Sequence, residues 1–360
     1  MTEKTVKKLI QAAGIFADPA AGPTIALFMN IYDKAFSRYE RPDYSLYPGL
    51  YCYSRVENEF KRREISFYDK NIKLQGYYYE CENPLGIVIT AHGLHSGADD
   101  YIPIQKFFYD HSFNVFSFDY KGTYSSEGDS TVGACESLVD LDVAIKFVKE
   151  KLNTKGLPLF LFGHSWGGYA CLASLSLHKD IKACAAVSSM VDGHTIINDK
   201  AKEYAGKMHY LTKPYIVVYQ RYLFKNYVDY DAIKGINSTN APIYIAHGIS
   251  DKVINYYTQS IFSKKGEIKN PNVTFYQGMG LHGDHNDILL SIDAISYRHE
   301  VESMLNLLEH EKGNLSDEDK KEFYKTIDHK RYSSPNLDIM LPILQMFLNA
   351  LDKKWFFVVQ

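Results

Sequence analysis

The feature that most constrains the fold is a series of short, almost continuously apolar segments that alternate with segments of helical pattern. The apolar segments are residues 86–93, 113–120, 157–163, 181–189, 241–248 and 272–279. Strands buried on both faces need such runs, because helices cover both sides of a parallel sheet. Helices are predicted between them at residues 102–111, 136–152 and 169–178. The alternation predicts an α/β fold with a mostly parallel, doubly wound sheet.

The 360 residues leave room for one large domain with additions at both ends. We predict a core at residues 64–312 that opens with a β-hairpin, because two strand-like runs flank the turn residues DKN. An aromatic-rich insertion at 190–240 is predicted to form a helical lid. Residues 313–360 are predicted to form a C-terminal helical extension that ends in an apolar tail, WFFVV.

Residues 1–63 are predicted to form an N-terminal cap. Apolar side chains recur at helical spacing from Val6 to Ala13, and a second apolar stripe runs from Ile25 to Phe36. We interpret both stripes as faces that pack on the main domain. A role in binding a membrane surface or a partner remains the alternative.

Charge and cysteine content exclude several classes of protein. The net charge is −3, so no positive field is available to hold a nucleic acid. The five cysteines are odd in number and scattered, which argues against a disulfide framework or a zinc–cysteine site. The sequence shows neither a secretory signal pattern nor an integral membrane segment of ~20 apolar residues, so a cytoplasmic location is predicted. Oligomeric state stays open.

The strongest chemical signal is GHSWG at residues 163–167, which follows an apolar strand and precedes a helical pattern. A serine on such a tight strand-to-helix turn is exposed at the end of the sheet, and small neighbours are needed where the backbone is crowded. The N-terminus of the following helix favours negative charge. Ser165 is therefore the candidate nucleophile.

The segment TAHGLHSG at residues 90–97 follows an earlier strand and supplies a second part of the site. Its turn would direct the backbone N–H of Leu94 toward the point served by the N–H of Trp166. Two such donors can form an oxyanion hole, which stabilises the negative charge of a tetrahedral intermediate. His92 and His95 could instead be a metal-binding pair, but this loop offers no third ligand.

Candidates for the remaining catalytic groups follow the last two strands. Asp251 comes after the strand at 241–248 and can accept a hydrogen bond from a histidine, which fixes its tautomer. His282 and His285 both follow the strand at 272–279 and compete for the role of general base. The chain order serine, aspartate, histidine is the one expected for a serine placed on this kind of turn.

Residues 278–289 also allow two other interpretations. The glycines form a G-x-G-x-x-G pattern, but they lie near the end of the sheet, where a dinucleotide site is not expected. His282, Asp284, His285 and Asp287 could in principle hold a metal. We predict neither a metal nor any other cofactor.

These segments together resemble the α/β-hydrolase superfamily, and in particular its esterase, lipase and serine-peptidase-like branch, over residues 64–312. FDYKGTYSSEG resembles the D-x-x-G-x-G-x-S turn of those enzymes, with Thr123 and Tyr124 replacing the usual glycine spacing. GDHNDI resembles the G-H-N-D turn of the family, which favours His285 over His282, although Asp284 stands where glycine is common.

The resemblance implies a serine hydrolase with the triad Ser165, Asp251 and His285, acting on a small-molecule ester or acyl substrate through an acyl-serine intermediate. The aromatic lid favours apolar or aromatic acyl groups, with candidate contacts at the lid residues Tyr215, Tyr219 and Tyr222. A serine peptidase or amidase and an acyltransferase would use the same triad. A catalytically silent ligand-binding protein is the alternative of a different class.

Overall fold

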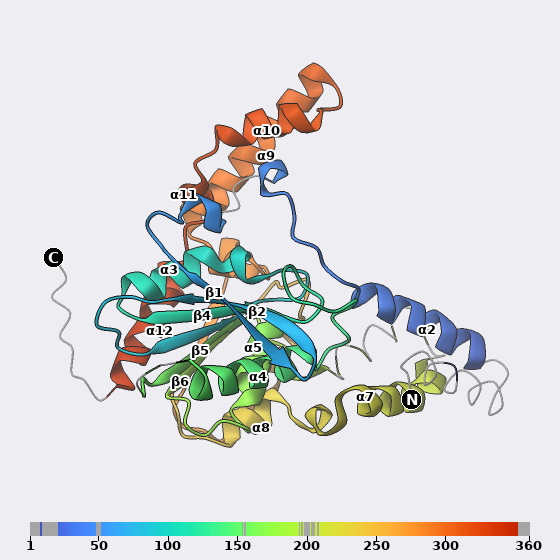
Figure 1. Cartoon of the computed structure of the whole chain (residues 1–360). Coiled ribbons are helices and arrows are strands. Elements are labelled where there is room, and N and C mark those ends of the chain that lie inside the picture. The colour runs from blue at the N-terminus through green and yellow to red at the C-terminus, as the bar shows by residue number, and fades with distance from the viewer. Residues whose placement is uncertain are drawn as a thin grey trace.

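An eight-stranded sheet forms the centre of the protein in this computed structural model (Figure 1). Its order is β1-β2-β4-β3-β5-β6-β7-β8. The strands are β1 (Arg63–Asp69), β2 (Ile72–Tyr79), β3 (Ile87–Ala91), β4 (Asn114–Asp119), β5 (Leu159–His164), β6 (Ala183–Val187), β7 (Ile243–Gly248) and β8 (Val273–Gly278). The β1–β2 hairpin and the β2–β4 pair are antiparallel, and all other pairs are parallel.

Helices cover both faces of this sheet, which confirms the predicted fold class. On one face lie α4 (Glu136–Glu150), α5 (Trp166–Ser174) and α8 (Ala232–Asn237), and on the other lie α3 (Ile102–Asp110) and α12 (Leu337–Asn349). Alternate residues of one strand enter opposite cores, as Leu161 and Phe162 of β5 do. Burial on both sides is the physical reason for the continuous apolar runs.

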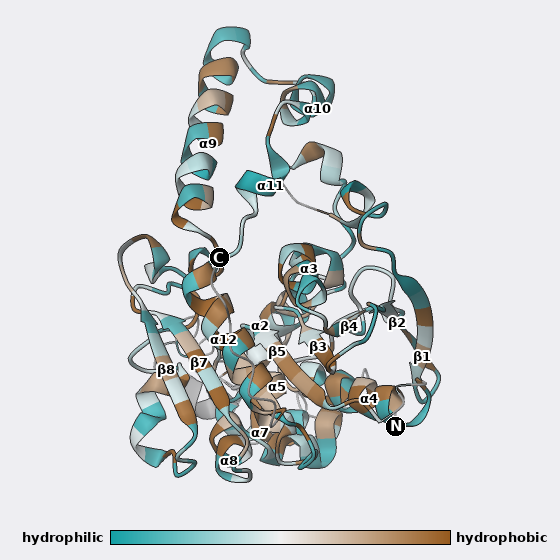
Figure 2. Cartoon of the chain, turned by 90° about the vertical axis from the view of Figure 1, so that its left-hand side faces the viewer, coloured by the Kyte–Doolittle hydropathy of each residue, from teal (hydrophilic) through white to brown (hydrophobic). Residues whose placement is uncertain are grey.

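The helix α12 lies in the segment that we predicted as a C-terminal extension. Its apolar residues join the core on the α3 side of the sheet, where the Phe347 ring lies 4.8 Å from that of Phe160 and 5.6 Å from that of Phe108, centroid to centroid. Figure 2 shows α12 beside the central strands, which are largely apolar. The helix is thus a component of the core.

Two helices from distant parts of the sequence form a small separate core. The N-terminal helix α2 (Ala21–Ala35) packs against α7 (His209–Phe224), which belongs to the predicted lid. Tyr32 and Tyr219 meet edge to face with ring centroids 5.6 Å apart. The side chain of Leu94 packs against the same cluster. The predicted lid and cap therefore contact each other next to the turn that follows β3.

The helices α9 (Ile292–Lys312), α10 (Asp317–Lys325) and α11 (His329–Tyr332) form an arm that projects from the sheet in both views (Figures 1 and 2). A small cluster containing Val301, Tyr324 and Ile327 holds the arm together. Ser316 caps α10 through a capping box with Asp319.

The structure describes residues 8, 21–47, 52–152, 154, 156–193, 195, 197, 202, 206 and 209–351. The first predicted apolar stripe, apart from Lys8, and the apolar tail at 355–359 lie outside these residues. Within them, no helix combines the length and the apolar character that crossing a bilayer requires.

Candidate active site

The site begins at the turn between β5 and α5, where Ser165 has φ 56° and ψ −118°. This left-handed conformation is strained for a residue with a side chain and recurs at functional turns. Two glycines make the turn sterically feasible. A Cβ on Gly163 would lie 2.3 Å from the carbonyl oxygen of Gly167, and a Cβ on Gly167 would lie 2.2 Å from that of Ala91. The positions of the two glycines, each two residues from Ser165, thus follow from the crowding of the backbone around this turn.

The substitution Gly167→Ala is expected to lower the free energy of unfolding by about 3 kcal/mol, because the added methyl group meets backbone atoms that cannot rotate away. Urea denaturation would measure the loss. The matched control is Gly266→Ala, where an added Cβ meets nothing within 4 Å. Equal stability of Gly167→Ala and the wild type would contradict the crowding argument.

The structure brings Ser165, His285 and Asp251 together from three separate loops. His285 Nε2 lies 3.0 Å from Ser165 Oγ, and His285 Nδ1 lies 2.7 Å from Asp251 Oδ2. Ser165 is half-buried, whereas both partners are buried. In this geometry Nδ1–H donates to the carboxylate, which leaves the lone pair of Nε2 facing the hydroxyl group.

The competing histidine, His282, lies elsewhere in the same loop. Its Nε2 lies 2.9 Å from the carbonyl oxygen of Leu290, and the side chain is buried. The ring therefore ties the β8 loop to the segment that precedes α9. Of the two candidate bases, His285 is the one that contacts the serine.

Asp251 accepts hydrogen bonds on both carboxylate oxygens. The backbone N–H groups of Val253 and Ile254 donate to Oδ1 at 2.8 Å each, and His247 Nε2 lies 3.0 Å from Oδ2. Burial acts to raise the pKa of Asp251, but the hydrogen bonds from His247 and His285 outweigh it and hold the pKa below its usual range. The carboxylate therefore stays ionised beside His285.

The turn after β3 is fixed by the side chains of His92 and Tyr101, on either side of Gly93. The N–H of Gly93 donates to Tyr101 Oη at 3.0 Å, and its carbonyl oxygen lies 2.7 Å from His92 Nδ1. His92 Nε2 accepts from the N–H of Tyr120 at 3.2 Å. Burial lowers the pKa of His92 to about 3, so the ring is neutral. Both ring nitrogens of His92 are thus used in holding the backbone.

The two amides predicted as oxyanion donors flank this arrangement. Trp166 is the first residue of α5, where helix N–H groups have no partner inside the helix, and Leu94 follows Gly93 directly. Within the described part of the chain, neither amide donates a hydrogen bond to another protein group. A Cβ on Gly93 would lie 3.5 Å from Ser165 Cβ, so the turn lies against the serine.

A chain of hydrogen bonds links this turn to the histidine, through residues that the sequence did not single out. Tyr101 Oη lies 2.7 Å from His164 Nδ1, and His164 Nε2 lies 3.1 Å from the carbonyl oxygen of His285. The hydroxyl of Ser188 donates to the same carbonyl at 2.9 Å. Burial, together with the nearby His285, lowers the pKa of His164 to about 3. A neutral His164 therefore accepts from Tyr101 and donates to His285.

The three lid tyrosines differ in their surroundings. Tyr219 is fully buried at the contact between α2 and α7, Tyr215 is half-buried beside the same cluster, and Tyr222 is 36% exposed. The stretch of aromatic residues is thus used in part for helix packing.

An acidic cluster lies at the end of β4, formed by Asp69, Glu136 and Asp140. Lys121 Nζ forms ion pairs with Asp69, at 3.3 Å, and with Glu136, while the N–H of Lys121 donates to Asp140. The lysine supplies the positive charge that these carboxylates need, so the cluster anchors the turn after β4.

Comparison with known proteins agrees with this architecture. A family model described as serine aminopeptidase, S33, matches residues 82–232. The Pyrococcus furiosus esterase Pf2001 has the same fold in two crystal forms. One has a TM-score of 0.51 at 21% identity over 74% of this chain and 97% of the esterase, and the other a TM-score of 0.53 at 18% identity over 77% and 97%.

The likeness to these structures shows that the chain has the fold of that esterase, and the family model matches residues 82–232 within it. Among curated proteins it is similar to the uncharacterized protein YfhR of Escherichia coli, with 26% identity over 205 residues, which are 55% of this chain and 66% of YfhR. The chain thus spans just under two thirds of the length of that relative.

Proposed function

We propose that this protein is a serine hydrolase that cleaves carboxylic esters through an acyl-serine intermediate. The observation that carries the proposal is the continuous contact from Ser165 Oγ to His285 Nε2, at 3.0 Å, and from His285 Nδ1 to Asp251, at 2.7 Å. A nucleophile within hydrogen-bond reach of a base, itself oriented by a carboxylate, is the arrangement that activates serine.

In the proposed reaction, Ser165 Oγ attacks the ester carbonyl carbon while His285 Nε2 takes its proton. The N–H groups of Leu94 and Trp166 receive the oxyanion, a contribution of about 3 kcal/mol for each donor in comparable enzymes. His285 then gives the proton to the departing alcohol as the tetrahedral intermediate collapses. A water molecule, activated by His285 in turn, attacks the acyl-serine and releases the acid.

We propose an apolar or aromatic acyl group for the substrate. The α2–α7 cluster lies beside Leu94, which places aromatic side chains near the proposed oxyanion site. Aromatic and apolar walls are usual for pockets that take small organic substrates. We keep Tyr215 and Tyr222 as proposed contacts, of which Tyr222 is the more exposed, whereas Tyr219 packs in the contact between α2 and α7.

The description of the matching family model favours a second candidate, an aminopeptidase with the same triad. The two candidates differ in the leaving group, because an amine must be protonated before it can depart, whereas a p-nitrophenolate ion need not be. Aminoacyl p-nitroanilides therefore distinguish a peptidase from an esterase.

The test is hydrolysis of p-nitrophenyl esters with acyl chains of increasing length and of aromatic acids, with aminoacyl p-nitroanilides in parallel. We expect measurable turnover of esters, a preference for apolar acyl groups and covalent labelling by a fluorophosphonate. If the anilides were turned over faster than the esters, the proposed function would be that of a peptidase and not of an esterase. If neither turnover nor labelling were observed, the remaining hypothesis would be a catalytically silent ligand-binding protein.

A further inference from the structure

The segment Phe36–Arg41, which follows α2 and lies outside the residues matched by the family model, is hydrogen-bonded to the turn after β4. The N–H of Tyr39 donates to Gly122, and that of Tyr124 donates back to Tyr39, at 2.9 and 3.0 Å. The guanidinium of Arg38 donates to the carbonyl oxygens of Tyr124, Ser126 and Gly128. This segment is thus built into the hydrolase core.

Tyr124 lies in this turn after β4, and its backbone conformation is one that needs support from neighbouring groups. It has φ 39°, in the left-handed region that favours glycine, and stands at a position where the resembling turns carry a different spacing of glycines. Its ring stacks on Tyr39 at 5.9 Å between centroids and lies against Gly97, where an added Cβ would come within 2.1 Å of it. Its hydroxyl donates to Asp100 Oδ2 at 2.6 Å. The side chain of Tyr124 thus contacts the turn after β3 at Gly97 and Asp100.

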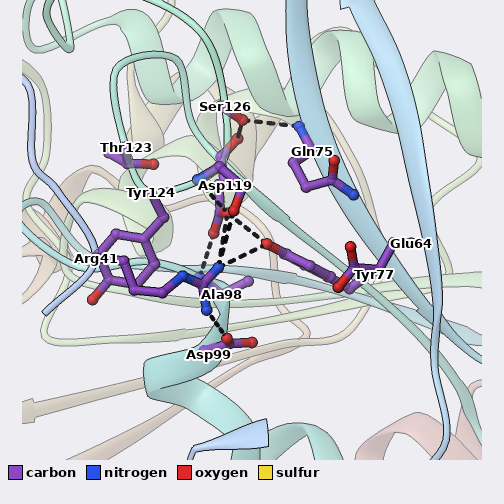
Figure 3. A network of polar contacts seen from close by, with 12 residues as sticks. Arg41, Glu64, Gln75, Tyr77, Ala98, Asp99, Asp119, Thr123, Tyr124 and Ser126 are labelled. Atoms are coloured by element: carbon purple, nitrogen blue, oxygen red, sulfur yellow. Dashed lines mark hydrogen bonds and ion pairs between the residues drawn. The ribbon is translucent and has the colours of Figure 1, made fainter. Parts of the chain in front are cut away.

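Arg41 lies between Tyr124 and two acidic residues, Asp99 and Asp119, as Figure 3 shows. Its guanidinium forms an ion pair with Asp99, lies 3.8 Å from Asp119 Oδ2 and donates to Tyr77 Oη at 3.0 Å. It also lies over the Tyr124 ring, 5.0 Å from the centroid. Asp99 and Asp119 are almost completely buried, so their charges need a cation nearby.

Two carboxylates of this group, Asp119 and Asp100, hold the backbone of the turn Gly93–Tyr101. Asp119 Oδ1 accepts from the N–H of Ala98 at 2.9 Å, and Asp100 Oδ2 accepts from that of Gly97 at 3.0 Å. His95 Nε2 lies 2.9 Å from the carbonyl oxygen of Ala35, the last residue of α2. The turn is therefore fixed by Tyr101 at one end and by the N-terminal segment along its length.

We propose that Arg41 is a positioning residue for the hydrolase reaction. By holding Asp99, Asp119 and Tyr124 in place, it keeps the turn Gly93–Tyr101 in the conformation that directs the N–H of Leu94 at the oxyanion. The inference rests on the proposed function, since a positioned donor has a kinetic effect only if an oxyanion forms. It assigns the N-terminal segment to the catalytic unit.

The experiment uses the full chain with Arg41→Gln, which keeps hydrogen-bond donors but removes the charge. Arg62 also pairs with Asp99, so that carboxylate stays compensated and the variant is expected to fold. We expect kcat for p-nitrophenyl esters to fall about 10- to 100-fold with KM within about threefold, because a displaced donor loses most of its transition-state stabilisation. Hydrogen exchange in peptides covering residues 92–101 should accelerate.

Two further variants isolate the effect. Arg41→Lys keeps the charge without the planar fork and should recover part of kcat. Arg331→Gln removes an arginine that is paired with Asp293 on the projecting arm, and should leave both kcat and exchange in residues 92–101 unchanged.

The inference is overturned if Arg41→Gln keeps the wild-type kcat, if exchange in residues 92–101 does not change, or if Arg331→Gln lowers kcat to the same extent. Loss of kcat with faster exchange in Arg41→Gln alone supports it. A wild type without esterase activity or fluorophosphonate labelling would instead remove the proposed function, so the two failures are distinguishable.

Discussion

If Ser165 is the nucleophile, as proposed, its replacement by alanine is expected to lower kcat on p-nitrophenyl esters on the order of a million-fold, as loss of the nucleophile does in known serine hydrolases. The reason is that Oγ is the atom that His285 Nε2 faces and that must bond to the acyl carbon. Steady-state kinetics and labelling by a fluorophosphonate measure the two consequences, turnover and covalent modification.

The matched control for this variant is Ser174→Ala, at the other end of α5. Ser174 is buried, and its hydroxyl donates to the carbonyl oxygen of Cys171 within the same helix. We expect it to retain labelling and most of kcat. Persistent ester turnover in purified Ser165→Ala would rule out the proposed nucleophile.

Replacement of His285 by alanine is expected to reduce kcat to a similar extent, because a triad loses most of its catalysis when its base is removed. His282→Ala provides the internal comparison, since both residues lie in the loop after β8 and both are buried. Because His282 contacts the carbonyl oxygen of Leu290 and not Ser165, its loss should change kcat less than about tenfold while costing about 1 kcal/mol of stability.

Ester hydrolysis and thermal unfolding of both histidine variants separate catalysis from stability. The assignment holds if activity disappears only in His285→Ala. If His282→Ala were inactive and His285→Ala active, the base would be His282, and the orientation of this loop in solution would differ from that described above.

Most of the sheet could be predicted because burial on both faces leaves a direct mark on the sequence. Each predicted strand overlaps an observed one, and the β1–β2 hairpin turns at the predicted residues. The start of α5 was predicted at residue 169, three positions after its observed start at Trp166. Gly167 and Gly168 are poor helix formers, so the helical pattern becomes visible only after them.

The site was predictable where residue type and chain order carry the information, and less so where packing decides. Ser165 is marked by its glycines, but the choice between His282 and His285 depends on which ring faces the serine. Tyr101 and His164 went unnoticed because their link exists only in three dimensions.

In the N-terminal segment, too, the sequence pattern predicts apolar packing but not the polar contacts. Its apolar stripe predicts packing, which the contact between α2 and α7 confirms. A pattern of hydrophobic residues contains no information about ion pairs, so the contact from Arg41 to Asp99, 58 residues apart in sequence, could not be foreseen.

The position of α12 has a consequence for how this protein can be made. The strands that it covers end near residue 248, but the helix itself begins at Leu337. During synthesis, one face of the sheet therefore stays without its last helix until about one hundred further residues have left the ribosome, at typical rates of about 5–20 residues per second. A fragment that stops at residue 312 would leave the Phe108 and Phe160 rings without the side chain of Phe347. Aggregation is the expected fate of such a fragment.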